Sequence, residues 1–177
     1  MEQPENKIVI VTGPESTGKT ILTLGLAAHY KVSYIEEYAR KYIENLNTKY
    51  TYSDIEHIAC WQRDALENAR KGNANKLWIA DTYLIITKIW FLWVYGKYPQ
   101  WIDPEIARTT HCLYLLCAPD IAWEPDPLRE NGGENRLKLF EAYRHELESF
   151  RLDYRIVTGV EEERFINALN FTEQYLK

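Results

Sequence analysis

An eight-residue run near the start of the chain constrains the fold more than any other feature. Residues 13–20 read GPESTGKT and match the pattern G-x-x-x-x-G-K-[ST] at every fixed position. The run follows an apolar, β-branched segment at 8–11 and precedes a mostly apolar stretch at 21–28. A strand, this loop and a helix in that order are typical of the phosphate-binding loop of nucleotide-binding proteins. The sequence therefore predicts a parallel α/β fold that binds a nucleoside triphosphate.

The residue types in this loop have separate chemical tasks. The two glycines let the backbone curl so that successive N–H groups face phosphate oxygens, beside the positive end of the next helix. Lys19 is expected to reach the β- and γ-phosphates, and the Thr20 hydroxyl to bind the magnesium ion that bridges them. ATP and Mg²⁺ are the expected cofactors. The ATP-binding residues predicted here are Gly13, Pro14, Glu15, Ser16, Thr17, Gly18, Lys19 and Thr20.

Length and composition limit the class of protein. A chain of 177 residues suits one sizeable core, so we expect a single domain over 1–177. The formal net charge of -5 argues against a nucleic-acid partner. Three cysteines without Cys-x-x-Cys spacing, and a polar start without an export signal, favour a cytoplasmic protein. The apolar segment 77–95 is interrupted by Asp81 and Lys88, so we interpret it as a strand and a helix and expect no membrane contact.

The alternation of apolar strand-like and helix-like segments predicts a three-layer fold with a five-stranded parallel sheet, like that of nucleoside and nucleotide kinases. The expected strands are 7–12, 31–35, 77–81, 111–117 and 155–157. The expected helices cover about 19–30, 38–42, 51–71, 82–95, a short stretch from Pro104, 136–150 and 160–176. Ser53, with Glu56 three residues later, is the expected N-cap of the long third helix.

Carboxylates follow the expected strands, where ligands of open parallel sheets bind. Asp81 ends an apolar strand and is expected to serve magnesium beside Thr20. Glu36 and Glu37 follow the second strand, where an acceptor hydroxyl would approach the γ-phosphate, so one of them could take its proton or orient it. A solvated helix N-terminus is the other interpretation of this pair.

Residues 120–136 have the composition of a lid. Prolines and the Gly-Gly pair at 132–133 favour mobility, while Arg129 and Arg136 would neutralise charge on the transferred phosphoryl group. An ordinary charged surface loop is the alternative. The sequence lacks the Asn-Lys-x-Asp segment of GTPases and the Ser-Gly-Gly signature of transporter ATPases. Phosphoryl transfer to a small acceptor is therefore favoured.

Five segments taken together point to one family. They read VTGPESTGKT at 11–20, EYARKY at 37–42, DT at 81–82, WEPDPLR at 123–129, and VTG at 157–159 followed by EER at 162–164. In these segments the chain resembles the ribosylnicotinamide kinase domain of bacterial NadR-type proteins, and the resemblance covers nearly the whole chain. The His-x-Gly-His motif of multifunctional members is not found, so the expected product is the mononucleotide.

The resemblance implies that ATP phosphorylates the ribose 5′-hydroxyl of nicotinamide riboside, giving nicotinamide mononucleotide for NAD salvage. It implies that Glu37 faces the acceptor hydroxyl and that Asp81 serves magnesium or ribose. It also implies that Arg129 and Arg136 clamp phosphates, and that Thr158 and Gly159 lie at the turn that holds adenine. The acceptor-binding residues expected in addition are Glu36, Arg40, Gln62, Trp123 and Asp126.

Two alternatives remain open. The acceptor could be another nucleoside or a small alcohol, because sites and not folds determine the substrate. The chain could instead be a regulatory ATP-binding module that works through a partner, with the aromatic-rich helix at 82–95 as its contact face. The six tryptophans could offer π faces to a pyridinium ring, although core or interface packing is their commoner use. A homo-oligomer is also left open.

Overall fold

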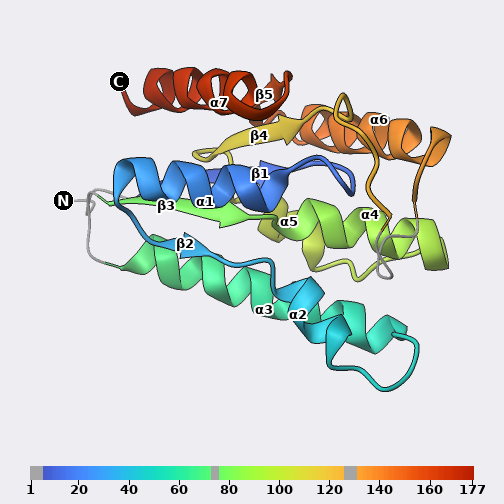
Figure 1. Ribbon diagram of the computed structural model, residues 1–177. Helices are drawn as coiled ribbons and strands as arrows, with labels where there is room; N and C mark the ends of the chain where they lie inside the picture. The colour runs from blue at the N-terminus through green and yellow to red at the C-terminus, as the bar shows by residue number, and fades with distance from the viewer. Residues whose placement is uncertain (1–5, 73–75, 126–130) are drawn as a thin grey trace.

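Five parallel strands form the central sheet, in the order β2-β3-β1-β4-β5 (Figure 1). The computed structural model describes residues 6–72, 76–125 and 131–177. The strands are β1 (Lys7–Thr12), β2 (Tyr34–Ile35), β3 (Leu77–Asp81), β4 (Leu113–Cys117) and β5 (Asp153–Val157). The predicted five-stranded parallel sheet is confirmed.

Strand β1 lies in the middle of the sheet and pairs with β3 on one side and β4 on the other. Its residues from Ile8 to Val11 are fully buried, which explains a continuous apolar run in place of an alternating pattern. Ile8 and Ile10 belong to one core cluster, and Val9 and Val11 to a second. Because successive side chains of a strand point to opposite faces, the two clusters lie on opposite sides of the sheet.

Helices cover both faces of the sheet (Figure 1). Helices α1 (Lys19–Tyr30) and α7 (Glu161–Leu176) pack on the face that holds Val9 and Val11. The opposite face, around Ile8 and Ile10, is covered by α3 (Tyr52–Lys71), α4 (Leu84–Tyr95), α5 (Ile102–Ala107) and α6 (Glu134–Ser149). The short α2 (Tyr38–Glu44) packs against α3. This is the three-layer arrangement that the sequence predicts.

The second strand is shorter than predicted because the preceding helix ends in a tight turn. Lys31 adopts a left-handed conformation with φ of 54° and caps α1 through its backbone N–H. The N–H of Val32 then donates to the carbonyl of Ala27 at 3.0 Å. These residues are therefore used to end the helix, and pairing with β3 is limited to Tyr34 and Ile35.

The predicted cap of α3 is wrong. Thr51, and not Ser53, precedes the helix, and its backbone N–H donates to the Asp54 carboxylate at 2.7 Å. The Thr51 hydroxyl donates to the same oxygen at 2.6 Å. Both residue pairs have the three-residue spacing of a capping box, but the helix begins two residues earlier than Ser53 would allow.

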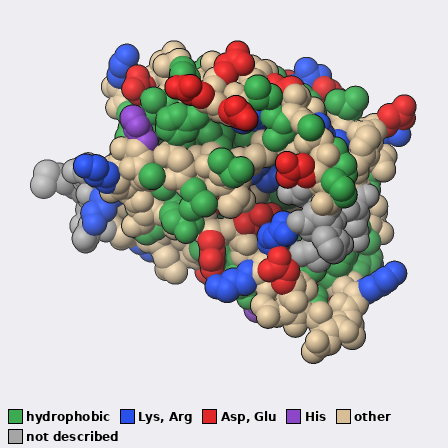
Figure 2. Space-filling model, viewed as in Figure 1, with side chains coloured by type: hydrophobic (Ala, Val, Ile, Leu, Met, Phe, Trp, Pro, Cys, Tyr) green, Lys and Arg blue, Asp and Glu red, His purple; other side chains and the backbone are tan. Residues whose placement is uncertain are grey.

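The apolar segment 77–95 is divided between β3 and α4, as predicted. In the described ranges, none of the helices is long and apolar enough to cross a membrane. On the face shown in Figure 2, acidic and basic side chains are interspersed with hydrophobic and polar ones. A continuous basic surface, which binding to nucleic-acid backbones requires, does not cover the described residues of this face.

Candidate active site

A cleft of about 1080 Å³ opens beyond the carboxyl ends of β1 and β2. Residues 15–21 of the phosphate loop and the start of α1 line one end of it. Glu37, the segment 46–50, one side of α4, and Leu139 and Tyr143 of α6 line the rest. The cleft therefore combines the predicted nucleotide site with enough adjoining space for a second small molecule.

The phosphate loop is closed by contacts within the loop. The Lys19 ammonium donates to the carbonyl oxygen of Pro14 at 2.7 Å, and the Thr17 hydroxyl donates to the same oxygen at 2.9 Å. Gly18, with φ of 74°, turns the chain into α1. At Gly13 φ is 133°, and a Cβ atom would lie 2.8 Å from the carbonyl oxygen of Cys117. The loop is thus held in a curled shape that requires glycine.

Asp81 lies beside this loop because it ends β3 directly opposite Val11 of β1. Its side chain is buried, and neither carboxylate oxygen has a hydrogen-bond partner among the described residues. Burial, and then the charge of Glu37, raise the pKa of Asp81 to about 6, whereas the nearby Thr20 hydroxyl and Lys19 ammonium act to lower it. Two free carboxylate oxygens next to a hydroxyl form a donor set that suits Mg²⁺.

The structure separates the two neighbouring glutamates. Glu37 is half-buried at the N-terminus of α2 and lines the cleft. Glu36 is exposed, pairs with Lys41 at 3.3 Å, and lies outside the lining that the described residues form. Glu37 is also near enough for its charge to raise the pKa of Asp81. Of the two carboxylates, Glu37 has the position expected of a group that faces an acceptor.

Arg136 does not have the predicted position on the phosphate side of the cleft. It is buried, and its guanidinium donates to the carbonyl oxygens of Pro119 at 2.7 Å, Ile121 at 2.6 Å and Ser16 at 3.4 Å. Burial lowers its pKa. These carbonyls use the donors that the prediction assigned to phosphates, so Arg136 joins the segment after β4 to the back of the phosphate loop.

The other predicted lid residues are also placed away from the cleft or cannot be placed. Trp123 packs beside Arg136, with 5.9 Å between the ring centroid and the guanidinium carbon. It is not among the described residues that line the cleft. Arg129 and Asp126 lie outside the described residues. Asn131, in contrast, lines the cleft and donates from its backbone N–H to the Glu15 carboxylate at 3.0 Å.

Of the two remaining predicted acceptor residues, only one lines the cleft. Arg40 lies at the lining and pairs with Glu44 at 3.0 Å. Gln62 is buried between α3 and α4, where its amide donates to Thr82 at 3.3 Å and accepts from Thr87 at 3.2 Å. Since Thr87 lines the cleft, Gln62 stands behind the lining and holds the Thr87 hydroxyl.

Three aromatic side chains in the cleft form what we call the aromatic wall; the sequence offered the tryptophans as possible π faces but favoured core or interface packing for them. We define it as Tyr50, Trp90 and Trp93, all of which line the cleft. The rings of Tyr50 and Trp90 meet edge to face, with centroids 4.8 Å apart. Ile86, Trp90 and Trp93 lie on one side of α4 at spacings of four and three residues. That helical spacing predicts that the three side chains share one helix face, but it does not distinguish a face that meets a ligand from one that meets the core.

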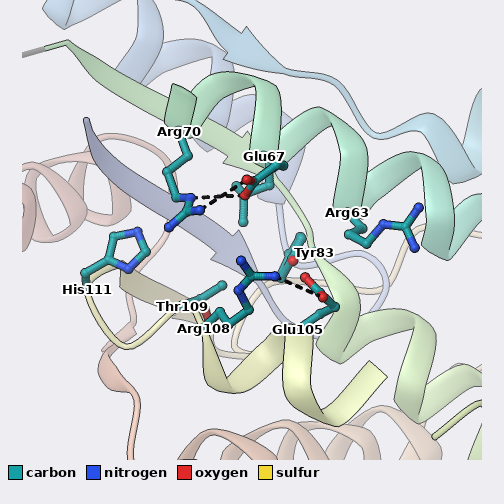
Figure 3. Close-up of a pocket in the computed structure, with 9 residues that line it drawn as sticks. Arg63, Glu67, Arg70, Tyr83, Glu105, Arg108, Thr109 and His111 are labelled. Carbon is teal, nitrogen blue, oxygen red and sulfur yellow. Dashed lines mark hydrogen bonds and ion pairs between the residues drawn. The ribbon is translucent and has the colours of Figure 1, made fainter. Parts of the chain in front are cut away.

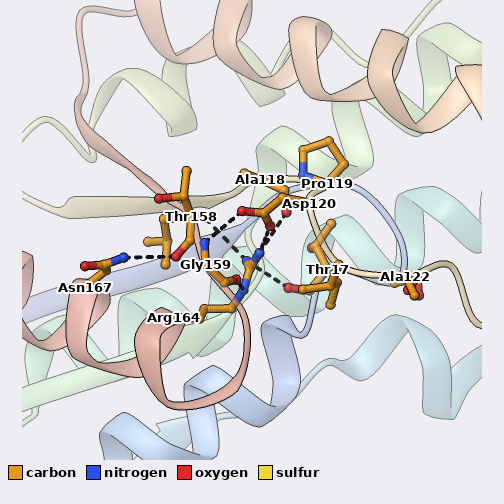
Figure 4. A network of polar contacts seen from close by, with 12 residues as sticks. Thr17, Ala118, Pro119, Asp120, Ala122, Thr158, Gly159, Arg164 and Asn167 are labelled. Atoms are coloured by element: carbon orange, nitrogen blue, oxygen red, sulfur yellow. Dashed lines mark hydrogen bonds and ion pairs between the residues drawn. The ribbon is translucent and has the colours of Figure 1, made fainter.

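The predicted adenine turn is attached to the phosphate loop through Arg164 (Figure 4). The Gly159 N–H donates to Asp120 at 2.8 Å, and the Gly159 carbonyl accepts from Arg164 at 2.8 Å. Arg164 also donates to the carbonyl of Thr17 at 3.2 Å. Thr158 is exposed beside this network. The sequence had included Arg164 only as part of a family motif.

A second, much smaller cavity lies between α3 and α5 (Figure 3). Its volume of about 20 Å³ has room for roughly one water molecule. Two arginines in its lining are already paired, Arg70 with Glu67 at 3.0 Å and Arg108 with Glu105 at 3.3 Å. This cavity is therefore too small and too well neutralised to compete with the cleft as a ligand site.

The fold and the cleft define a phosphate-loop nucleotide-binding domain with the architecture of nucleoside and nucleotide kinases. Comparison with known families matches residues 8–164 to the AAA domain family. The chain belongs to that family.

Solved structures agree with this placement. The structure of NadR in complex with NR is 25% identical in sequence to this chain and superposes with a TM-score of 0.76. The match covers 96% of this chain and 50% of the NadR chain. The structure of NadR in complex with NAD and AMP-PNP is also 25% identical, with a TM-score of 0.74. That match covers 96% of this chain and 49% of the NadR chain. The chain thus spans about half the length of these NadR proteins. The resemblance to NadR that the sequence predicts is confirmed.

Two kinases share the fold at lower identity. Thymidylate kinase from Ehrlichia chaffeensis is 12% identical with a TM-score of 0.62, and covers 97% of this chain and 100% of that chain. Deoxyadenosine kinase from M. mycoides is 12% identical with a TM-score of 0.63, and covers 96% and 100%.

Proposed function

We propose that this chain is an ATP-dependent kinase that phosphorylates the 5′-hydroxyl of nicotinamide riboside, giving nicotinamide mononucleotide for NAD salvage. The observation that carries the proposal is that the phosphate loop, Glu37 and the aromatic wall all line one cleft. The similarity to NadR structures that contain NR, NAD and AMP-PNP supports this pair of substrates.

On the nucleotide side, the proposed chemistry rests on positioning and charge. The backbone N–H groups of residue 13 and of residues 15–18 would face the phosphate oxygens, and Lys19 would exchange the Pro14 carbonyl for a γ-phosphate oxygen. Asp81 and Thr20 would hold Mg²⁺. When bound, the ion neutralises the charge of the β- and γ-phosphates. Asp81 would then have a cation partner for its buried charge.

On the acceptor side, Glu37 would accept a hydrogen bond from the 5′-hydroxyl and aim it at the γ-phosphate. Phosphoryl transfer passes through a loose transition state, so orientation of the attacking oxygen contributes more than early removal of its proton. The proton passes to the Glu37 carboxylate as the new O–P bond forms and the bond to the ADP oxygen breaks. The half-buried position of Glu37 at the lining of the cleft suits this role.

The aromatic wall would select the base. Nicotinamide riboside carries a positively charged pyridinium ring, which is attracted to the faces of Trp and Tyr rings. Trp93 is 45% exposed, although a tryptophan used only for core packing would be mostly covered. The wall and Glu37 line the same cleft, so we propose that a riboside whose base contacts the wall places its ribose 5′-hydroxyl at Glu37.

The test is ADP production from magnesium-ATP in the presence of individual acceptors. Nicotinamide riboside should stimulate ADP production strongly. Its reduced form, which has nearly the same size but a neutral ring, should be a poorer substrate, and mass spectrometry should find nicotinamide mononucleotide. Stimulation by a different nucleoside or a small alcohol would replace the proposed substrate and keep the kinase. ATP hydrolysis that no acceptor changes would favour a regulatory ATP-binding module.

A further inference from the structure

The guanidinium of Arg164 joins three segments of the chain, and the phosphate loop is one of them (Figure 4). Arg164 lies near the start of α7 and is only 5% exposed. Its nitrogens donate to the carbonyl oxygens of Thr17 at 3.2 Å, Ala118 at 3.1 Å and Gly159 at 2.8 Å. It also forms an ion pair with Asp120. The phosphate loop, the end of β4 and the turn after β5 therefore share one buried side chain.

The turn at 158–159 has its backbone groups held by neighbouring elements. The Gly159 N–H donates to Asp120 at 2.8 Å, and the Thr158 carbonyl accepts from the Asn167 side chain at 3.1 Å. Gly159 has φ of 92°, and a Cβ atom there would lie 2.8 Å from the Glu163 side chain. The shape of this turn depends on a glycine and on the pair formed by Asp120 and Arg164.

A continuous path of hydrogen bonds leads from this turn to the catalytic lysine. Arg164 contacts the Thr17 carbonyl, the Thr17 hydroxyl donates to the Pro14 carbonyl at 2.9 Å, and that carbonyl accepts from Lys19 at 2.7 Å. Each step is a bond between groups that are buried or partly buried. A displacement of Arg164 would alter the support of both the turn and the loop.

We infer that Arg164 is a positioning residue that makes the phosphate loop and the turn at 158–159 one unit, so that the triphosphate and the base of ATP are recognised together. This inference rests on the proposed binding of ATP and on the adenine position that the resemblance to NadR-type kinases implies for Thr158 and Gly159. A planar guanidinium has several donors in a fixed arrangement, whereas an ammonium is a single mobile point charge. Burial of an ion pair adds little net stability compared with apolar side chains of similar size. What Arg164 adds is the fixed geometry of the segments that it joins.

The test compares binding of two nucleotide-site ligands by titration calorimetry in the presence of Mg²⁺. AMP-PNP carries both base and phosphates, and inorganic tripolyphosphate carries phosphates alone. Arg164→Lys keeps the positive charge and loses the planar guanidinium with its several donors. Asp120→Asn keeps the size of the side chain and loses the ion pair. Arg155→Lys is the matched control, because Arg155 is an exposed arginine on β5 whose partners among the described residues, Asp153 and Tyr154, belong to the same strand.

We expect Arg164→Lys to weaken AMP-PNP binding at least tenfold and tripolyphosphate binding by a smaller factor. The ratio of AMP-PNP affinity to tripolyphosphate affinity should therefore fall. Asp120→Asn should weaken AMP-PNP binding more than tripolyphosphate binding, because Asp120 bonds the turn directly and reaches the loop through Arg164. Arg155→Lys should bind both ligands as the parent does. A purely structural role would lower the melting temperature and leave both affinities within twofold at a temperature where the variant is folded, which would overturn the inference.

Two further readouts keep the outcomes separate. If Arg164→Lys does not fold, the ratio of the two affinities in Asp120→Asn decides, and an unchanged ratio rejects the inference. Binding of AMP-PNP needs no acceptor. A parent protein that binds AMP-PNP but phosphorylates no riboside would therefore reject the proposed function. The ratio of AMP-PNP affinity to tripolyphosphate affinity would still decide the Arg164 inference. If the parent phosphorylates nicotinamide riboside but the Arg164→Lys variant keeps the parent's affinity ratio, the Arg164 inference is rejected and the proposed function stands.

Discussion

The Lys19 ammonium donates to the carbonyl oxygen of Pro14, five residues earlier in the same loop, at 2.7 Å. This contact shows where the lysine rests when its partner comes from the protein itself. The Pro14 carbonyl also accepts from the Thr17 hydroxyl, so it keeps a donor when Lys19 leaves. The loop can therefore release its lysine to a phosphate without leaving a buried carbonyl unsatisfied.

Lys19→Met tests this arrangement. The variant keeps the length of the side chain and removes its charge, so we expect kcat to fall by about 10² to 10³, as for the loss of one group that stabilises transition-state charge. Because Thr17 still satisfies Pro14, the melting temperature without ligand should change little. Steady-state kinetics and thermal unfolding measure the two effects. Near-parental kcat would show that this lysine does not act on the phosphates.

The neighbouring glutamates offer a matched pair of variants. Glu37→Gln keeps the size and removes the carboxylate that lines the cleft, so kcat should fall by about 10² to 10⁴ while AMP-PNP affinity stays close to the parent value. Glu36→Gln should behave like the parent, because an exposed pair such as Glu36 with Lys41 contributes little. Single-turnover kinetics with nicotinamide riboside distinguish the two. The reverse order of effects would exchange their roles.

How far the sequence predicts this site depends on whether a feature is local. The phosphate loop, Asp81 and the parallel order of the strands follow from short patterns, and all are found where expected. Gln62 and Arg136 are different, because their partners come from α4 and from the loop after β4. A polar residue type is equally suited to a ligand or to a buried carbonyl, and only the tertiary packing decides between them.

The aromatic wall also depends on contacts between residues that are distant in sequence, so local patterns do not predict it. Tyr50 and Trp90 are 40 positions apart in sequence and meet only after α3 has turned the chain back toward α4. The apolar spacing along α4 predicts a helix face, but a core-facing side and a ligand-facing side have the same pattern. The exposed fraction of Trp93, which the fold sets, is what separates them.

The buried Asp81 predicts an unusual dependence of stability on pH in the absence of Mg²⁺. Its pKa is raised from 3.8 to about 6, so the folded state binds the proton more tightly than the unfolded chain does. Stability should therefore fall as pH rises from about 4 to above 6, with a total cost of about 3 kcal/mol. Asp81→Asn removes this cost.

Denaturant unfolding without Mg²⁺ measures this effect. At pH 8 the Asp81→Asn variant should be more stable than the parent, and near pH 4 the two should converge. Added Mg²⁺ should stabilise the parent at pH 8 and leave the variant nearly unaffected, since binding to the folded state alone raises stability. An Asp81→Asn variant that is less stable than the parent at pH 8 would contradict the assigned pKa.

Trp93→Leu tests whether the aromatic wall recognises a charged ring. Loss of one cation–π contact, about 0.5 to 2 kcal/mol, should raise KM for nicotinamide riboside about 2- to 30-fold and leave KM for ATP unchanged. The reduced, neutral riboside should be affected less, because the lost attraction acts on charge. Trp61→Leu is the control, since Trp61 stacks on Tyr38 at 4.3 Å and lies outside the described lining of the cleft. Equal losses for charged and neutral ribosides would show that Trp93 contributes shape and not π-face attraction, because dispersion and surface burial do not distinguish the two rings.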